Sequence, residues 1–258
     1  MDLQLKGKVA LITGGSRGIG RATALRFGSE GCNVAICARG EEGLNKTLGE
    51  LKDLGVMTFG VVADMSIAGE AARFVDEAAD ALGGVDMLVN NVGGSSNSTF
   101  SEACDEDWLK AFNLNLFHAV RATRASLPYF RKRGGGSVVT IASISGWRPA
   151  PDKAIYGASK AAEIFLSSSL AWELSPQNVR VNTVSPGSID FPGGVWERFR
   201  KQNPEQFAAF AGREFPAGRL GNAEEVADVI VFLSSPKANW INGAHIPVDG
   251  AQGRPSVF

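Results

Sequence analysis

The chain has 258 residues, of which 44% are hydrophobic, and its formal net charge is −1. This length suits one large α/β domain or two small ones with a sizeable core. A charge near zero excludes a global field that would attract nucleic acid or an anionic membrane. The N-terminal apolar run is too short for a signal peptide, and no apolar segment reaches 18 residues, so we expect a soluble cytoplasmic protein without a membrane partner.

Short β-branched runs alternate with longer amphipathic stretches along the chain. The expected strands are residues 8–13, 33–38, 57–63, 85–90, 137–142, 179–185 and 244–249. They are nearly continuous apolar runs, which indicates strands covered on both faces and hence a parallel sheet. The expected helices are residues 18–30, 41–54, 67–82, 101–133, 155–174 and 223–234. This alternation predicts the α/β class, as a Rossmann-type doubly wound, seven-stranded parallel sheet with helices on both faces.

No repeat, low-complexity tract or linker divides the sequence, so the whole chain, 1–258, is expected to form a single domain. The segment 186–221 between the sixth and seventh strands differs from the other connections. It carries several Gly and Pro residues, five Phe and one Trp, and it is too long for a plain turn. Residues of about 188–215 are therefore expected to form a lid over a binding site.

The stretch "TGGSRGIGRA" follows the first strand and opens the first helix. Its residues Gly14, Gly18 and Gly20 permit a tight turn in which backbone N–H groups approach a pyrophosphate at the helix N-terminus. A strand-to-helix turn without a ligand is the alternative interpretation. The flanking strand and helix favour a dinucleotide site.

The end of the second strand discriminates between the two nicotinamide dinucleotides. A site for NAD usually places Asp or Glu there, but this chain reads Ala38 and then Arg39, with Arg17 in the glycine turn. A guanidinium can bind a 2′-phosphate in bidentate fashion, whereas a carboxylate would repel it. We therefore expect NADP(H) as the cofactor. The alternatives are that both arginines are solvated surface residues, or that the cofactor is NAD(H).

Several further motifs follow in a fixed order. They are "NNVG" (90–93), "NLNLF" with Asn115, "IASISG" with Ser143, "YGASK" (156–160), "SPG" (185–187), "GRLGNAEEVA" (218–227) and "INGAHIPVDGA" (241–251). Together with the glycine turn, these motifs resemble the short-chain dehydrogenase/reductase family, in the compact single-domain branch of the 3-oxoacyl-acyl-carrier-protein reductases and their relatives. The resemblance covers essentially the whole chain.

The resemblance implies a catalytic set of Asn115, Ser143, Tyr156 and Lys160. Tyr156 and Lys160 stand four residues apart, which places them on one face of a helix. A free phenol titrates near 10, and a nearby ammonium favours the phenolate. In the family, the Tyr exchanges a proton with the substrate oxygen while hydride moves at the nicotinamide. The Ser donates to that oxygen, and the Asn holds a water that links the Lys to solvent.

The same resemblance implies the cofactor contacts. These are expected from Gly14, Ser16, Arg17, Gly18, Ile19, Gly20, Arg39, Asp64, Asn90, Gly93, Tyr156, Lys160, Pro186, Gly187 and Ile189. Asp64 matches a residue that accepts from the adenine amino group, although an acid near a helix start is the alternative. Phe191 departs from the family, which commonly has Thr at this place. No metal site is expected, because His118 and His245 are isolated in the sequence.

The substrate is expected to be a ketone or secondary alcohol. Aromatic side chains would make its pocket apolar and bulky, whereas charged ones would select a charged group. The aromatic candidates are Trp147, Phe191 and Trp196, and the charged candidates are Arg148, Asp190 and Arg213. The resemblance also implies a homotetramer, joined through the helices expected at 101–133 and 155–174 and the last strand. A catalytically idle relative that senses NADP(H) is the alternative function.

Overall fold

The computed structural model describes residues 1–95 and 99–254, and in these ranges seven strands form one parallel sheet. Their spatial order is β3-β2-β1-β4-β5-β6-β9. The strands are Val9–Thr13 (β1), Asn33–Ala38 (β2), Thr58–Val62 (β3), Met87–Asn90 (β4), Gly136–Ile141 (β5), Val179–Pro186 (β6) and His245–Val248 (β9). Each lies within two residues of its expected bounds, so the predicted doubly wound sheet is confirmed. The strand order reverses between β1 and β4, where open α/β sheets bind their ligands.

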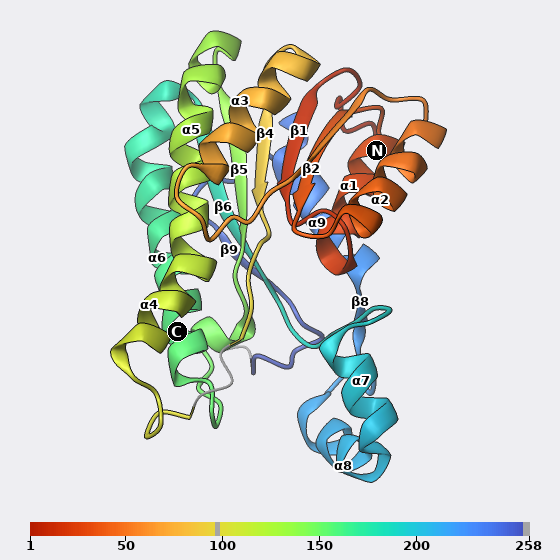
Figure 1. Ribbon diagram of the computed structural model, residues 1–258, viewed down its shortest axis with the longest axis vertical. Coiled ribbons are helices and arrows are strands. Elements are labelled where there is room, and N and C mark those ends of the chain that lie inside the picture. The colour runs from red at the N-terminus through yellow and green to blue at the C-terminus, as the bar shows by residue number, and fades with distance from the viewer. Residues whose placement is uncertain (96–98, 255–258) are drawn as a thin grey trace.

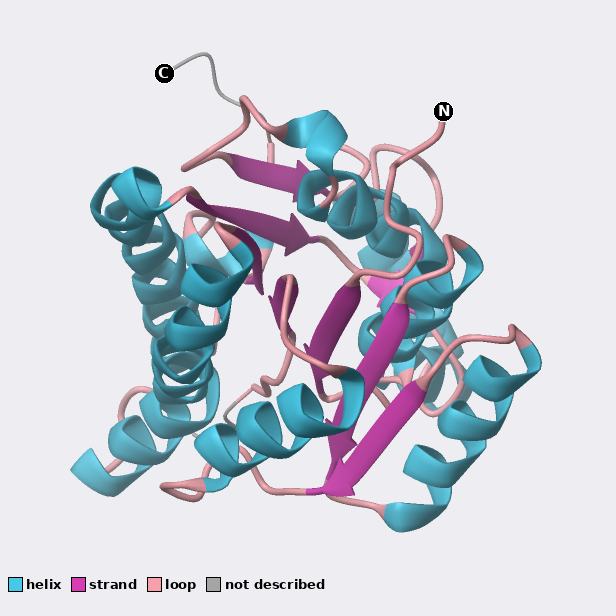
Figure 2. Ribbon diagram, turned by 90° about the horizontal axis from the view of Figure 1, so that it is seen from above, coloured by secondary structure: helices cyan, strands magenta, loops and turns pink. Residues whose placement is uncertain are grey.

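Helices cover both faces of this sheet (Figure 1). One layer consists of α1 (Gly18–Ser29), α2 (Glu41–Asp53) and α9 (Ala223–Ser234), and the other of α3 (Glu70–Leu82), α5 (His118–Arg133) and α6 (Ala154–Leu174). Figure 2 shows the strands between the two layers. Each layer packs on its own cluster of buried apolar side chains, centred on residues such as Phe27 and Ile36 on one side and Phe74 and Phe130 on the other. Burial on both faces explains the continuous apolar runs of the strands.

The helix expected at 101–133 differs from its prediction. It begins only at Asp105 and consists of α4 (Asp105–Phe112), a π-helical turn η1 (Asn113–Phe117) and α5. The Asn115 side chain donates to the carbonyl of Ala111, 3.0 Å away, which in a regular α-helix would accept from the Asn115 backbone N–H. The polar side chain therefore takes part in the backbone bonding of this turn. π-turns of this kind are frequent at functional sites.

The expected lid segment contains two short helices, α7 (Val195–Gln202) and α8 (Pro204–Glu214). In Figure 1 they project beyond the two helical layers, past the ends of the strands. Two short paired strands, β7 (Ile189–Asp190) and β8 (Gly221–Asn222), close the base of this excursion. Its aromatic residues pack on one another: the Trp196 and Phe210 rings are 5.3 Å apart, and Phe210 and Phe215 are 5.6 Å apart. The remaining short turns are η2 (Ile144–Gly146), η3 (Ser175–Gln177) and η4 (Pro236–Ala238).

Across the described ranges, none of the helices combines the length and apolarity needed to cross a membrane.

Candidate active site

A cleft of about 520 Å³ opens where the carboxyl ends of β1, β2, β4, β5 and β6 meet. It brings together nearly all residues that the sequence predicted for the site, although they come from segments up to 175 residues apart. Those that line it are Gly14, Ser16, Arg17, Gly18, Ile19, Gly20, Arg39, Asp64, Gly93, Ser143, Tyr156, Lys160, Pro186, Gly187 and Ile189. Asn90 and Asn115 are the exceptions, and both are buried behind its wall.

The glycine turn forms one end of the cleft. A Cβ at Gly20 would collide with the carbonyl of Gly14, so the turn can close this tightly only around a residue without a side chain. Asn91 holds the turn from β4, since its Nδ2 donates to the carbonyls of Thr13 and Gly14 at 3.0 and 3.1 Å. No role was predicted for Asn91, although it stands inside the "NNVG" motif. Helix α1 begins at Gly18 and points its N-terminus into the cleft, where it favours an anion.

Arg17 and Arg39 lie at this same end, and both are exposed. In the part of the chain that the structure describes, neither guanidinium has an ion-pair partner. Ala38 contributes no carboxylate beside them. Asp64 lies nearby and accepts from the backbone N–H and hydroxyl of Ser66 at 2.9 and 2.7 Å, and these bonds hold the pKa of its carboxyl below the usual value. Arg17 and Arg39 therefore place two positive charges next to the glycine turn, and the charge of Arg39 also helps to lower the pKa of Asp64.

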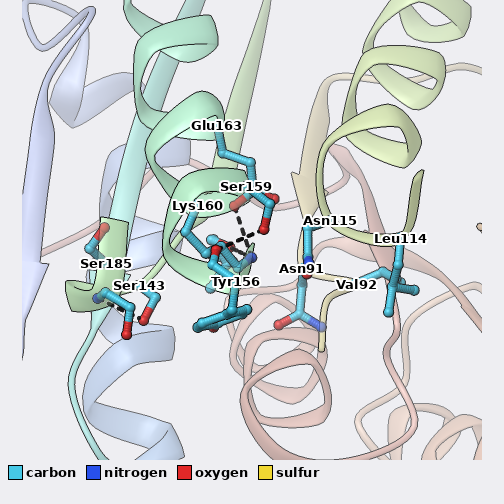
Figure 3. Close-up of polar contacts among 12 residues, drawn as sticks. Asn91, Val92, Leu114, Asn115, Ser143, Tyr156, Ser159, Lys160, Glu163 and Ser185 are labelled. Atoms are coloured by element: carbon cyan, nitrogen blue, oxygen red, sulfur yellow. Dashed lines mark hydrogen bonds and ion pairs between the residues drawn. The ribbon is translucent and has the colours of Figure 1, made fainter. Parts of the chain in front are cut away.

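Tyr156 and Lys160 enter the cleft from the first turns of α6 (Figure 3). The Lys160 ammonium donates to the carbonyl of Ile141 at 2.8 Å and lies 5.9 Å from the centre of the Tyr156 ring. Its side chain is only 3% exposed. Burial by itself lowers the pKa of Lys160, but the Glu163 carboxylate and Tyr156 outweigh it and raise that pKa above the usual value. Lys160 is therefore a fixed positive charge beside the phenol.

Glu163 is a second residue that the sequence analysis missed. Its carboxylate lies 2.8 Å from the Lys160 ammonium, and its side chain is fully buried. An acid three residues after Lys160, on the inward face of an otherwise weakly charged helix, was the available signal. Burial raises the pKa of Glu163 to about 7, although Lys160 opposes the shift.

Ser143 stands at the end of β5, where the chain turns into η2. Its Oγ accepts from the backbone N–H of Ser145 at 3.1 Å, which leaves the hydroxyl hydrogen available for another acceptor. Figure 3 places Ser143 on the side of Tyr156 opposite to Asn115. Ser143 and Tyr156 line the same cleft.

Asn115 clamps the loop after β4. Its Oδ1 accepts from the N–H of Gly94 at 2.9 Å and its Nδ2 donates to the carbonyl of Gly94 at 3.1 Å. A Cβ at Gly93 would lie 2.9 Å from this Oδ1 and 3.0 Å from the Lys160 ammonium, so only glycine fits between them without displacing either. Asn90 is buried as well, and its Nδ2 donates to the hydroxyl of Thr123 at 3.1 Å. Asn115 and Asn90 therefore support the segments behind the cleft wall and do not line the cleft themselves.

Phe191 and Trp196 line the cleft, and the Phe191 ring lies against Gly18 of the glycine turn. Trp147 instead packs edge-on against His245, with ring centroids 4.7 Å apart. The three charged residues that were candidates for substrate binding form ion pairs with other residues of the chain. Ion pairs join Arg148 to Glu214, Asp190 to Arg200 and Arg213 to Glu214.

Comparison with known proteins identifies the family. Residues 8–203 match the family model described as short chain dehydrogenase. A 3-oxoacyl-(acyl-carrier-protein) reductase of Thermotoga maritima is 34% identical over 248 residues, which covers 96% of this chain and 98% of that protein. The chain therefore belongs to the short-chain dehydrogenase family, a family of oxidoreductases that transfer hydride with NAD(P)-type cofactors.

Two solved structures illustrate the range of its relatives. The L-sorbose reductase of Gluconobacter frateurii, complexed with NADPH and L-sorbose, is 35% identical, with a TM-score of 0.93 over 99% of this chain and 100% of that one. A 7α-hydroxysteroid dehydrogenase complexed with NADH and 7-oxo glycochenodeoxycholic acid is 31% identical, with a TM-score of 0.89 over 96% and 95% of the two chains. Fold similarity alone therefore does not choose between the two dinucleotides, nor between a sugar and a steroid.

Proposed function

We propose that this protein is an NADP(H)-dependent oxidoreductase of the carbonyl reductase and alcohol dehydrogenase type, which interconverts a ketone and a secondary alcohol. The observation that carries the proposal is that Ser143, Tyr156 and the buried ammonium of Lys160 share one cleft with the glycine turn. The proposed proton-transfer groups and the glycine turn thus line the same cleft. Trp196 also lines the cleft, and an apolar side chain there suits a substrate with an apolar part.

The residues present fit NADP(H). Gly14, Gly18 and Gly20 with the α1 N-terminus would hold the pyrophosphate, and Arg17 and Arg39 would bind the 2′-phosphate. When bound, the nicotinamide supplies or accepts hydride. The remaining contacts are proposed at Ser16, Ile19, Asp64, Gly93, Lys160, Pro186, Gly187 and Ile189, which line the same cleft. For Asn90, which is buried, we propose only an indirect role.

In the direction of reduction, the Tyr156 hydroxyl would give its proton to the carbonyl oxygen as negative charge develops there. Ser143 would donate its hydroxyl hydrogen to the same oxygen. Lys160 would stabilise the resulting phenolate, since an ammonium in a water-poor cleft favours a nearby anion. Asn115 would keep the loop at Gly93 and Gly94 in place beside the ammonium. In alcohol oxidation, Tyr156 would act as the base.

The test is the substitution Tyr156→Phe, assayed against a panel of ketones with NADPH. General acid–base catalysis contributes about 100-fold or more to the rate, so turnover should fall by at least that factor. The fluorescence of bound NADPH should titrate as in the unmodified protein, because the ring is kept. Turnover that persists in the variant would refute the role of Tyr156. Unmodified protein that binds NADPH but reduces no carbonyl would instead favour an idle sensor.

Two further proposals concern architecture. We propose that residues 1–258 act as a single dinucleotide-binding and catalytic domain in which the segment 188–215 is the substrate lid. We also propose a homotetramer, supported by large apolar side chains that are exposed on α6: Phe165 and Trp172 are 76% and 88% exposed. They are seven residues apart and therefore share one face of the helix. Exposed aromatic residues of this kind are typical of buried interfaces.

A further inference from the structure

The ammonium of Lys160 lies between two oxygen-bearing side chains of its own helix. Tyr156 precedes it by one turn, and Glu163 follows it by nearly one turn, on the side away from the cleft (Figure 3). The ammonium and the Glu163 carboxylate are 2.8 Å apart, with side chains that are 3% and 0% exposed. The positive charge of Lys160 is therefore compensated by a carboxylate that does not line the cleft.

A buried carboxylate at this position carries a cost that packing does not explain. Taking an ion pair out of water costs desolvation free energy that its mutual attraction often fails to recover, and an apolar pair of similar volume is frequently as stable. Apart from the ion pair, neither oxygen of Glu163 has a hydrogen-bond partner in the ranges 1–95 and 99–254. A residue of this kind is poorly suited to a purely structural role. The one polar contact of the Glu163 carboxylate among the described residues is its ion pair with Lys160.

The other groups around the pair leave Glu163 as its counter-charge. Strand β5 contributes the neutral carbonyl of Ile141, and η1 contributes the neutral amide of Asn115. On α5, burial lowers the pKa of His118 to about 3, with the charge of Lys160 acting in the same direction, so the imidazole is neutral near pH 7. Tyr156 is the remaining titratable neighbour. Among the described residues, no second anion compensates Lys160.

We infer that Glu163 is a positioning residue that, through Lys160, sets the pH at which Tyr156 releases its proton. Above the Glu163 pKa of about 7 the carboxylate is ionised, so the cluster of Tyr156, Lys160 and Glu163 carries no net charge, and loss of the Tyr156 proton makes it negative. Without the carboxylate, and with Lys160 still protonated, the same cluster carries one positive charge, so Tyr156 loses its proton more readily. Glu163 thus keeps the phenol protonated to higher pH. This inference rests on the proposed function, in which Tyr156 moves the proton.

The chain offers a direct readout, because it contains only two tyrosines, Tyr129 and Tyr156. The hydrogen bond from Tyr129 to Asp76 raises the pKa of Tyr129 to about 12. The ultraviolet absorbance of phenolate can therefore be followed at lower pH without interference from Tyr129. The step in the absorbance titration that disappears in Tyr156→Phe is the ionisation of Tyr156. The measurement needs neither substrate nor turnover.

The test is Glu163→Gln, which removes the charge and keeps the shape. Its Tyr156 step should move to lower pH by about one unit, the Coulomb effect expected from one charge about 10 Å away, two turns along the same helix. The pH limb of kcat/KM in alcohol oxidation should move in the same direction. Glu173→Gln is the matched control, because Glu173 is an exposed carboxylate on the same helix. In this control the step should stay in place.

A step that is unmoved, or that moves to higher pH, in Glu163→Gln would overturn the inference. If that variant does not fold, Glu163→Asp retains the charge at a greater distance and should show a smaller shift of the same sign. The two proposals fail differently. Activity that survives Tyr156→Phe defeats the proposed function, whereas an inactive Tyr156→Phe combined with an unshifted Glu163→Gln defeats only the role of Glu163.

Discussion

The Arg148 guanidinium lies 2.6 Å from the Glu214 carboxylate and ties the loop after β5 to the last residue of α8. A second nitrogen of the same guanidinium donates to the carbonyl of Gln252 at 2.7 Å. The guanidiniums of Arg213 and Arg148 together hold the pKa of Glu214 below its usual value. One side chain thus connects the proposed lid, the C-terminal segment and the loop that leads to Tyr156.

Replacing Arg148 by Ala should loosen the proposed lid. We expect the KM for a ketone substrate to rise about tenfold, equivalent to about 1.4 kcal/mol of binding free energy, with a smaller change in kcat. Arg213→Ala is the control, since Arg213 also contacts Glu214, at 3.0 Å, but its side chain is 70% exposed. Exposed pairs contribute little, so its KM should change by less than about twofold. Equal effects of the two substitutions would contradict a special role for Arg148.

Arg39 should determine the choice of dinucleotide. We expect the unmodified protein to bind NADPH at least tenfold more tightly than NADH, by fluorescence titration. Arg39→Asp should weaken NADPH by about 10- to 100-fold, the effect of losing a charge-assisted hydrogen bond, and should strengthen NADH. Arg124→Asp is the control, because Arg124 is exposed on α5 and makes the same change in net charge. Equal affinities for the two dinucleotides in the unmodified protein would mean that the cofactor is NAD(H) or that selectivity is absent.

The exposed face of α6 should hold the oligomer together. Sedimentation equilibrium should give a mass of four chains for the unmodified protein and a smaller assembly for Phe165→Glu combined with Trp172→Glu, because a buried, unpaired carboxylate is unfavourable. Met57→Glu is the control, since Met57 is 54% exposed and lies near β3 at the other edge of the sheet. A monomer without any substitution would refute the proposed tetramer.

His118 should make the fold sensitive to acid. Burial lowers the pKa of His118 to about 3, whereas an unfolded chain binds the proton near 6.5. The contribution of neutral His118 to the free energy of unfolding is therefore fully present above pH 6.5 and is lost as the pH falls from 6.5 towards 3. Between pH 7.5 and pH 5, His118 should account for a loss of about 2 kcal/mol in the free energy of unfolding.

Urea unfolding at these two pH values measures this contribution. His118→Asn should lose about 2 kcal/mol less than the unmodified protein over the interval. The Asn amide retains a donor for the carbonyl of Leu114, which lies 2.8 Å from Nδ1 of His118. Identical losses for the two proteins would show that His118 titrates normally.

Local pattern was sufficient for the sheet and for most helices of both layers, although the helix predicted at 101–133 is divided at Asn113–Phe117. The resemblance to the short-chain dehydrogenases supplied the expected cofactor contacts, and residues as distant as Gly14 and Ile189 line one cleft because the carboxyl ends of parallel strands meet at one edge of the sheet. The glycine turn, Tyr156 and Lys160 are also recognisable because their spacing is local.

Three-dimensional packing was needed for the features that depend on contacts between distant segments. In the π-turn, the Asn115 side chain bonds Gly94 as well as Ala111, and periodicity along one helix cannot report a partner on another loop. Arg148 and Arg213 were equal candidates for binding a charged substrate until their ion pairs to Glu214 were seen. The burial of Glu163 likewise follows from how α6 packs against its neighbours, since an acid in a helix is ordinarily solvated and only the surrounding elements exclude water from it.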